Sequence, residues 1–246
     1  MIIIANWKAY VEDSKKAKAL FAESKKLASL SALTIVIAPP APLLSGLALR
    51  NRSRVSFAAQ DVSATLGGAQ TGEVTAAACA AAGASYAIVG HSERRAAGDS
   101  NAVVAEKLVH ILAHDLTPIL CVGERARDNE GLYLSFVREE LTSALAPLSA
   151  EDRARVIIAY EPIWAIGKTA EQSIEPHDLV EMTLYIRKVL AELLPGKSST
   201  RVPVLYGGSV EPGNIRELAG STVDGFLIGH ASVDKASFTA LVRNIA

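Results

Sequence analysis

Short runs of apolar residues, rich in isoleucine and valine, recur along the whole chain. They are continuous rather than alternating, which is typical of strands buried on both faces, as in a parallel sheet covered by helices. Eight such runs are present, and we expect strands at Ile2–Trp7, Leu33–Ala38, Val55–Ala59, Tyr86–Val89, Pro118–Val122, Val156–Tyr160, Val202–Tyr206 and Gly225–Ile228.

Segments with apolar residues at helical spacing separate most of these runs. Pro176 stands at the start of the longest segment and Pro195-Gly196 follows its end, where helix start and stop signals belong. The second and third intervals are less regular, although the small-residue run Ala76–Ala84 suits a helix packed closely on a sheet. We expect the other helices at Ser14–Leu27, Ala102–His114, Gly131–Leu145, Pro176–Leu194, Pro212–Ala219 and Lys235–Ile245.

Strand and helix alternate eight times within 246 residues, which predicts an α/β fold with a parallel sheet closed into a (β/α)8 barrel. The competing architecture is an open doubly wound sheet. It usually has a Gly-x-Gly-x-x-Gly motif after its first strand, whereas this chain has Asn6-Trp7-Lys8 there. No linker or shift in composition divides the sequence, so we expect residues 1–246 to form a single domain.

Charge and cysteine content indicate which partners and which compartment to expect. Lys and Arg total 25, Asp and Glu total 26, and the net charge of −1 argues against a nucleic acid or a membrane as partner. We find no secretory signal sequence and no apolar stretch of about 20 residues that would span a membrane. Cys79 and Cys121 lie far apart without a Cys-x-x-Cys motif, which fits a reducing compartment and predicts a cytoplasmic protein.

Polar residues follow the carboxyl ends of the predicted strands, and in a barrel these ends converge on one mouth. No His-x-x-x-His motif or carboxylate cluster is present, so we expect no metal site. For Arg95, a solvated position at a helix start is at least as good an interpretation as a role at the mouth. The strand-end residues are Asn6, Lys8, Gln60, His91, Glu93, Arg94, Arg95, Cys121, Glu124, Glu161, Ser209, His230 and Ser232.

Glycine-containing turns follow the seventh and eighth strands, at Gly207-Gly208-Ser209 and Gly229-His230-Ala231. Glycine lets the backbone approach a ligand, and in barrels these two loops commonly bind phosphate. For either turn alone, a simple tight turn is an equally good interpretation. The two together favour a phosphate ester as ligand.

Lys8, His91 and Glu161 come from the ends of the first, fourth and sixth strands. A carboxylate base, an imidazole that polarises a carbonyl and an ammonium that stabilises an oxyanion can together move protons. Each residue alone has a structural alternative: a satisfied histidine, a lysine at a strand end, a glutamate paired with an arginine. Their joint placement favours catalysis.

Several strings in order resemble the triosephosphate isomerase family over nearly the whole chain. They are Asn6-Trp7-Lys8, Gly90-His91-Ser92-Glu93-Arg94-Arg95, Cys121-Val122-Gly123-Glu124, the stretch from Ala159 to Gly167, and Tyr206-Gly207-Gly208-Ser209. The resemblance implies a TIM barrel that interconverts dihydroxyacetone phosphate and glyceraldehyde 3-phosphate without a cofactor, as in glycolysis and gluconeogenesis.

The resemblance also implies roles for particular residues. Glu161 would be the base, His91 a neutral electrophile, and Lys8 and Asn6 would hold the substrate, with Glu93 supporting the site. Backbone N–H groups of Gly167, Ser209, Gly229 and His230 would bind the phosphate. A lid would cover the substrate, formed by Pro162, Ile163, Trp164, Ala165, Ile166, Gly167, Lys168, Thr169 and Ala170.

Two departures from the family pattern stand near the expected phosphate site. Gly167 runs directly into Lys168, which predicts a lid two residues shorter than usual with an altered Ser209 contact, and His230 replaces a glycine. A shorter lid leaves open a four-carbon ketose phosphate as substrate. A barrel that binds a phosphorylated ligand without catalysis is a further alternative, which the retained Glu161 disfavours.

The segment Gly68-Ala69-Gln70-Thr71-Gly72-Glu73 resembles the family's dimer loop. By this resemblance, Thr71 would reach into the site of a neighbouring subunit. The apolar Leu66 in the same segment fits burial by a partner chain. We therefore expect a homodimer.

Overall fold

The computed structural model describes residues 1–168 and 173–246, and of Lys197 only the backbone. Within this part, eight strands form one closed barrel in sequence order, every neighbouring pair is parallel, and β8 pairs with β1. The predicted barrel is therefore confirmed, with one end of six of the strands shifted by one or two residues. The strands are β1 (Ile2–Asn6), β2 (Thr34–Ala38), β3 (Ser56–Ala59), β4 (Tyr86–Val89), β5 (Thr117–Val122), β6 (Ile157–Tyr160), β7 (Val204–Tyr206) and β8 (Gly225–Ile228).

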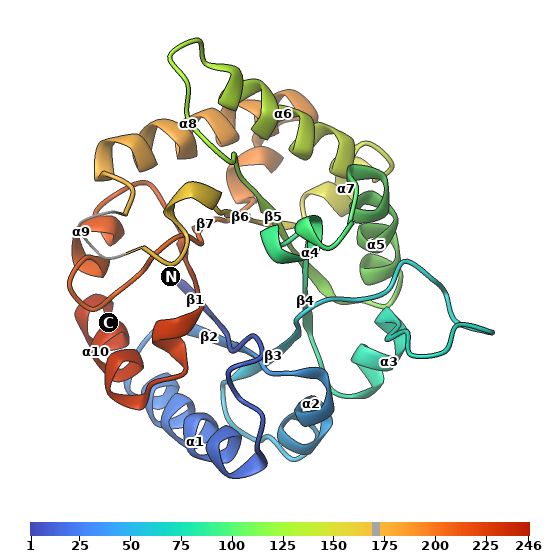
Figure 1. Ribbon diagram of the computed structural model, residues 1–246, viewed down its shortest axis with the longest axis vertical. Coiled ribbons are helices and arrows are strands. Elements are labelled where there is room, and N and C mark those ends of the chain that lie inside the picture. The colour runs from blue at the N-terminus through green and yellow to red at the C-terminus, as the bar shows by residue number, and fades with distance from the viewer. Residues whose placement is uncertain (169–172) are drawn as a thin grey trace.

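Helices surround the barrel on its outer side, as the view along the barrel shows (Figure 1). All the helices predicted from spacing are present with small shifts at their ends, whereas α2, α4 and α7 were not predicted. The α-helices are α1 (Ser14–Leu30), α2 (Ala41–Ala48), α3 (Ala76–Ala81), α4 (Ser92–Ala96), α5 (Asn101–Ala113), α6 (Leu132–Leu145), α7 (Ala150–Arg153), α8 (Pro176–Leu193), α9 (Ile215–Ala219) and α10 (Lys235–Ile245). Short 3-10 helices are η1 (Ile163–Ala165), η3 (Gly196–Arg201) and η4 (His230–Ser232).

Two apolar layers explain why the strand sequences are continuously apolar. Alternate strand residues such as Ile4, Val36 and Leu227 fill the inside of the barrel. Their neighbours in sequence, such as Ile3 and Ile35, pack outward against the helices in a second and larger cluster. Since both faces of each strand are buried, no polar face interrupts the pattern.

Side-chain caps begin many of the helices. A carboxylate or hydroxyl oxygen before the first turn accepts a hydrogen bond from an otherwise unpaired backbone N–H, which stabilises that end. Asp13, Thr75, Ser100, Ser149 and Asp234 do this for α1, α3, α5, α7 and α10.

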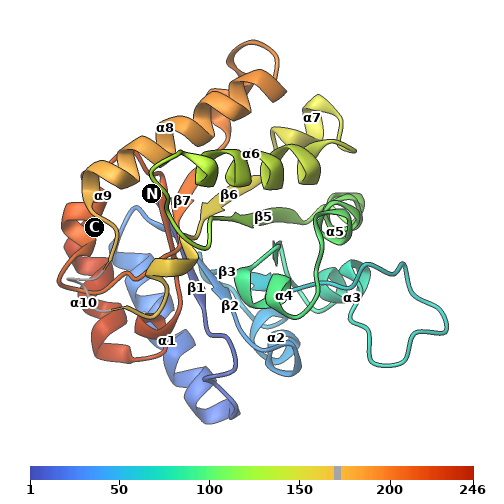
Figure 2. The same ribbon diagram turned by 45° about the horizontal axis from the view of Figure 1, so that its top comes forward.

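The loop between β3 and α3 projects from the body of the molecule in both ribbon views (Figures 1 and 2). Leu66 within it is exposed over 76% of its surface. No helix in the described part of the chain is long and apolar enough to cross a membrane.

Candidate active site

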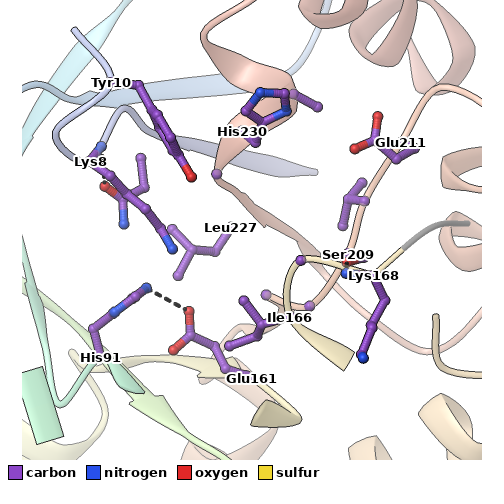
Figure 3. Close-up of a pocket in the computed structure, with 17 residues that line it drawn as sticks. Lys8, Tyr10, His91, Glu161, Ile166, Lys168, Ser209, Glu211, Leu227 and His230 are labelled. Atoms are coloured by element: carbon purple, nitrogen blue, oxygen red, sulfur yellow. Dashed lines mark hydrogen bonds and ion pairs between the residues drawn. The ribbon is translucent and has the colours of Figure 1, made fainter. Parts of the chain in front are cut away.

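A pocket of about 320 Å³ opens at the carboxyl ends of the strands (Figure 3). Its lining includes the predicted residues from the first, fourth, sixth, seventh and eighth strand ends, together with part of the lid segment. The structure thus brings together residues that lie far apart in the sequence. The lining residues used below are Asn6, Lys8, Tyr10, His91, Glu161, Gly167, Gly207, Ser209, Gly229 and His230.

Lys8 is held in an unusual backbone conformation directly after β1. Its φ angle is +44°, a left-handed conformation that non-glycine residues seldom adopt. The Gln60 amide donates hydrogen bonds to Lys8 O at 3.0 Å and to Ala38 O at 2.9 Å, and Asn6 Oδ1 accepts one from Lys8 N at 3.0 Å. These bonds fix the main chain from which the Lys8 ammonium reaches into the pocket.

Glu93 is the ionic partner of Lys8. The Lys8 Nζ atom lies 2.7 Å from Glu93 Oε1. Burial opposes ionisation of Glu93, but the hydrogen bond and positive charge of Lys8 outweigh it, so the pKa of Glu93 is lowered. Glu93 therefore orients the ammonium at the edge of the pocket.

The His91 ring is oriented by the short helix that follows β4. Its Nδ1 atom accepts a hydrogen bond from the backbone N–H of Glu93 at 3.2 Å. A ring nitrogen that accepts a hydrogen bond carries no proton in a neutral imidazole, so we assign the proton to Nε2. That atom lies 3.3 Å from Glu161 Oε1, so His91 directs its N–H toward the carboxylate and the pocket.

Glu161 follows β6 and is 3% exposed. Its Oε2 atom lies 3.5 Å from the backbone nitrogen of Ser92. Burial, followed by the negative charge of Glu161, raises the pKa of Cys121 well above its usual range, so this thiol remains protonated. A Cβ atom on Gly207 would lie 2.7 Å from Glu161 Cγ, so glycine is required there.

The glycine turns after β7 and β8 form another wall of the pocket. Gly229 lies beside the Lys8 side chain, and His230 begins η4. The His230 ring contacts the Tyr10 ring edge to face, with centroids 5.5 Å apart. Tyr10 lines the same pocket, and nothing in its sequence environment had marked it as a site residue.

The chain was then compared with known proteins. The sequence profile of the triosephosphate isomerase family matches residues 1–245. A triosephosphate isomerase from Cupriavidus pinatubonensis is 42% identical over 243 residues, which cover 98% of this chain and 97% of that protein. One from Thermus thermophilus is 39% identical over 247 residues, which cover 99% of this chain and 98% of that protein. The chain belongs to the triosephosphate isomerase family.

Membership of the triosephosphate isomerase family makes the chain an isomerase and confirms the resemblance inferred from the sequence strings. The family profile extends almost from end to end, which agrees with a barrel built from the whole sequence. The functional assignment of individual residues rests on the geometry described above.

The first part of the lid segment lies against Ser209. The Ser209 hydroxyl donates a hydrogen bond to Ala165 O at 2.8 Å and accepts one from the backbone N–H of Lys168 at 2.9 Å. Ser209 thus contacts lid residues on both sides of Gly167. Thr169 and Ala170 lie outside the described residues, and the expected shortening at this point remains a prediction.

The amino-terminal side of the lid is held by Glu124. Its Oε1 atom accepts hydrogen bonds from Trp164 Nε1 and from Tyr160 Oη, both at 2.8 Å. Arg127 lies 3.5 Å from the same oxygen and over the Trp164 ring. The sequence placed Glu124 at a strand end but indicated no role for it, because its contact with the lid segment depends on the direction of its side chain.

A groove of about 720 Å³ adjoins the pocket and shares Asn6, Lys8 and His91 with it. Residues on both sides of the projecting loop, including Ser63 and Val74, also line this groove. Thr71, at the exposed end of the loop, is not among the residues that line either cavity of its own chain.

Proposed function

We infer that this chain interconverts dihydroxyacetone phosphate and D-glyceraldehyde 3-phosphate without a cofactor. The observation that carries the proposal is the 3.3 Å approach of His91 Nε2 to Glu161 Oε1 inside a pocket that also contains Lys8. A base, a hydrogen-bond donor and a fixed cation around one cavity are what proton transfer next to a carbonyl group requires.

We assign the proton transfers as follows. Glu161 removes a proton from C1 of dihydroxyacetone phosphate while the N–H of His91 polarises the carbonyl oxygen at C2. His91 then donates its proton to the oxygen at C2 of the enediolate and takes up the proton of the oxygen at C1, so that the negative charge moves to the oxygen at C1. Glu161 then returns a proton to C2, so that the aldose is formed and both side chains regain their starting states.

The negative charge of the enediolate needs a positive group nearby. Lys8 supplies this charge, Glu93 orients its ammonium at 2.7 Å, and Asn6 fixes the backbone of Lys8 at 3.0 Å. These three residues therefore stabilise the intermediate together, while Glu161 and His91 move the protons.

The phosphate is proposed to bind backbone N–H groups of Gly167, Ser209, Gly229 and His230, which all line the pocket. Loops after the seventh and eighth strands of barrels commonly serve this purpose. The lid, Pro162 to Ala170, is proposed to exclude water, because an enediol phosphate in water readily loses its phosphate.

A homodimer is proposed from the groove beside the pocket and the exposed loop next to it. The groove borders Lys8 and His91, so Thr71 of a second copy placed there would stand beside the proton-transfer residues. A two-fold dimer would fill both grooves by the same contact. We further propose that residues 1–246 act as one domain and serve glycolysis and gluconeogenesis in the cytoplasm.

The variant Glu161→Asp tests the proposed function. Withdrawing the carboxylate by one methylene should lower kcat by about 100-fold or more and change KM far less, since the interaction belongs to the transition state. Glu106→Asp, at an exposed position on α5, is the matched control. Isomerisation is measured with triose phosphates and with a four-carbon ketose phosphate.

The outcomes of this assay separate the alternatives. A strong preference for the four-carbon substrate would contradict the triose assignment, and no turnover of either substrate would indicate a binding protein. If the Glu161→Asp variant is as active as the wild type, Glu161 is not the base.

A further inference from the structure

A small cavity of about 10 Å³ is lined in part by Glu161, which is the one residue that it shares with the lining of the substrate pocket. Its size matches one water molecule. A water molecule is retained inside a protein when at least two polar groups can bind it. The lining residues are Gly90, Ser92, Arg95, Val122, Gly123, Glu161 and Ile163.

Arg95 brings an unused donor to this cavity. Its Nε atom donates to Gly90 O at 2.7 Å and its Nη1 atom to Asn101 Oδ1 at 2.7 Å. Its Nη2 atom is buried and has no hydrogen-bond partner among the described residues. Nη2 would lie 3.1 Å from a Cβ atom on Gly90, another wall of the cavity. A buried N–H without a partner is costly, so a ligand that accepts from it is strongly favoured.

Glu161 brings an acceptor from the opposite side. Its Oε1 atom faces His91 at 3.3 Å, whereas among the described residues Oε2 has only the long contact of 3.5 Å with the backbone nitrogen of Ser92. A carboxylate offers about four lone-pair positions, so Oε2 retains capacity for another donor. The Ser92 hydroxyl is a further polar group in the same wall.

Glu140 on α6 holds the guanidinium in place. Its Oε1 atom lies 3.3 Å from Arg95 Nε, and its Oε2 atom accepts a hydrogen bond from Gly123 N at 2.9 Å. Gly123 itself packs directly against the backbone of Glu161. Burial raises the pKa of Glu140 to about 7, while Arg95 lowers it, so the two groups are electrically coupled.

We propose that this cavity binds one water molecule that accepts a hydrogen bond from Arg95 Nη2 and donates one to the Glu161 carboxylate. Arg95, held by Glu140, is then a positioning residue for the base. The water fixes the rotation of the carboxylate on the side away from the substrate. This inference rests on the proposed role of Glu161.

A crystal structure of the wild-type enzyme is the first test. We expect an ordered water molecule within hydrogen-bond distance of both Arg95 Nη2 and the Glu161 carboxylate. At a resolution that shows other buried waters, a cavity without this density overturns the proposal. So does a direct hydrogen bond between Arg95 Nη2 and Glu161. This test needs no variant and is independent of how substitutions fold.

Kinetics of Arg95→Lys is the second test. Lysine keeps the positive charge but lacks the Nη2 donor. We expect kcat to fall about tenfold with KM changed less than twofold, because the carboxylate loses a fixed orientation but the substrate contacts remain.

Arg138→Lys is the matched control, because Arg138 lies on α6 and forms an ion pair with Glu192 at the surface. If Arg95→Lys turns over substrate like Arg138→Lys, the positioning role is overturned. Failure of this inference differs from failure of the proposed function. In the first case Glu161→Asp remains impaired and Arg95→Lys does not, whereas in the second case Glu161→Asp itself is fully active.

Discussion

Room for the carboxylate of Glu161, the proposed base, depends on a residue that has no side chain. A methyl group on Gly207 would lie 2.7 Å from Glu161 Cγ and 3.3 Å from Oε1, so the carboxylate would have to move. From the sequence alone, Gly207 indicated a turn that binds phosphate. The structure adds that it also accommodates the base.

Gly207→Ala is expected to lower kcat by about 100-fold, since a displacement of about 1 Å at the reacting group has that effect. Gly213→Ala is the control, because nothing lies within 4 Å of the new Cβ atom there. Steady-state kinetics of both variants decides the matter. Equal turnover by the two would show that Glu161 tolerates the methyl group.

Glu140 gives the folded protein a defined pH dependence. Burial raises its pKa from 4.5 to about 7, opposed by Arg95 and the backbone of Gly123. The folded state therefore holds a proton that the unfolded chain releases at lower pH. The stabilisation of the folded state by this raised pKa is complete below about pH 4.5 and is lost as the pH rises through about 7. The loss in the free energy of unfolding is about 3 kcal/mol.

Glu140→Gln removes this titration. Relative to the wild type, the free energy of unfolding of the variant should rise by about 3 kcal/mol between pH 4.5 and pH 8. Urea denaturation across this range measures the difference, with the exposed neighbour Glu139→Gln as control. A difference that does not vary with pH would contradict the raised pKa.

At the scale of elements, hydrogen bonds to main-chain atoms hold the lid segment in place. Ser209 bonds Ala165 O and Lys168 N, while Glu124 holds the Trp164 ring on the other side. Each hydrogen bond contributes about 1 kcal/mol, so the two from Ser209 together favour this lid position by about tenfold or more.

Ser209→Ala should therefore raise KM several-fold and increase the share of intermediate that loses inorganic phosphate, because water reaches the enediolate more often. Phosphate release during turnover measures this share. Ser85→Ala, at an exposed serine before β4, is the control. If the variant releases no additional phosphate, Ser209 does not control the position of the lid.

The sequence predicted long and buried elements better than short ones. Strands buried on both faces appear as apolar runs, so all eight were found. Helix α2 was missed because it is short, Gly46 disfavours helices and its residues show little polar periodicity. Helix α4 has five residues, too few for a periodic pattern.

The placement of the site residues was predictable where they directly follow buried strands, as for Glu161, His91 and Lys8, which line one pocket as expected. It was not predictable where the role depends on the direction of a side chain. Arg95 fitted a solvated helix start equally well, yet its side chain is 12% exposed and contacts Glu140 on another helix. Gln60 stood at a strand end, but its two backbone acceptors come from other segments.

For the whole molecule, the projecting loop is the feature that a single chain does not explain. Leu66 is 76% exposed, and the proposed homodimer would bury it. The adjoining groove borders the active-site pocket, so association and activity are expected to change together.

Leu66→Glu should convert a dimer of two 25.9 kDa chains to monomers at micromolar concentration and lower activity with it, because a buried charge without a partner opposes association. Light scattering measures the mass. Leu30→Glu, at a leucine 71% exposed at the end of α1, is the control. A wild-type protein with the mass of one chain would rule out the dimer.

Because Ser209 forms its hydrogen bonds with main-chain atoms of the lid segment, a side chain of that segment can be replaced by a probe of lid movement. Cys79 and Cys121 are the two cysteines of the sequence, and both are buried. Lys168→Cys would therefore supply the one readily labelled thiol, while the N–H at that position remains available to Ser209. A fluorophore attached there would report opening and closing in solution, on a lid whose attachment does not depend on the side chain that carries the dye.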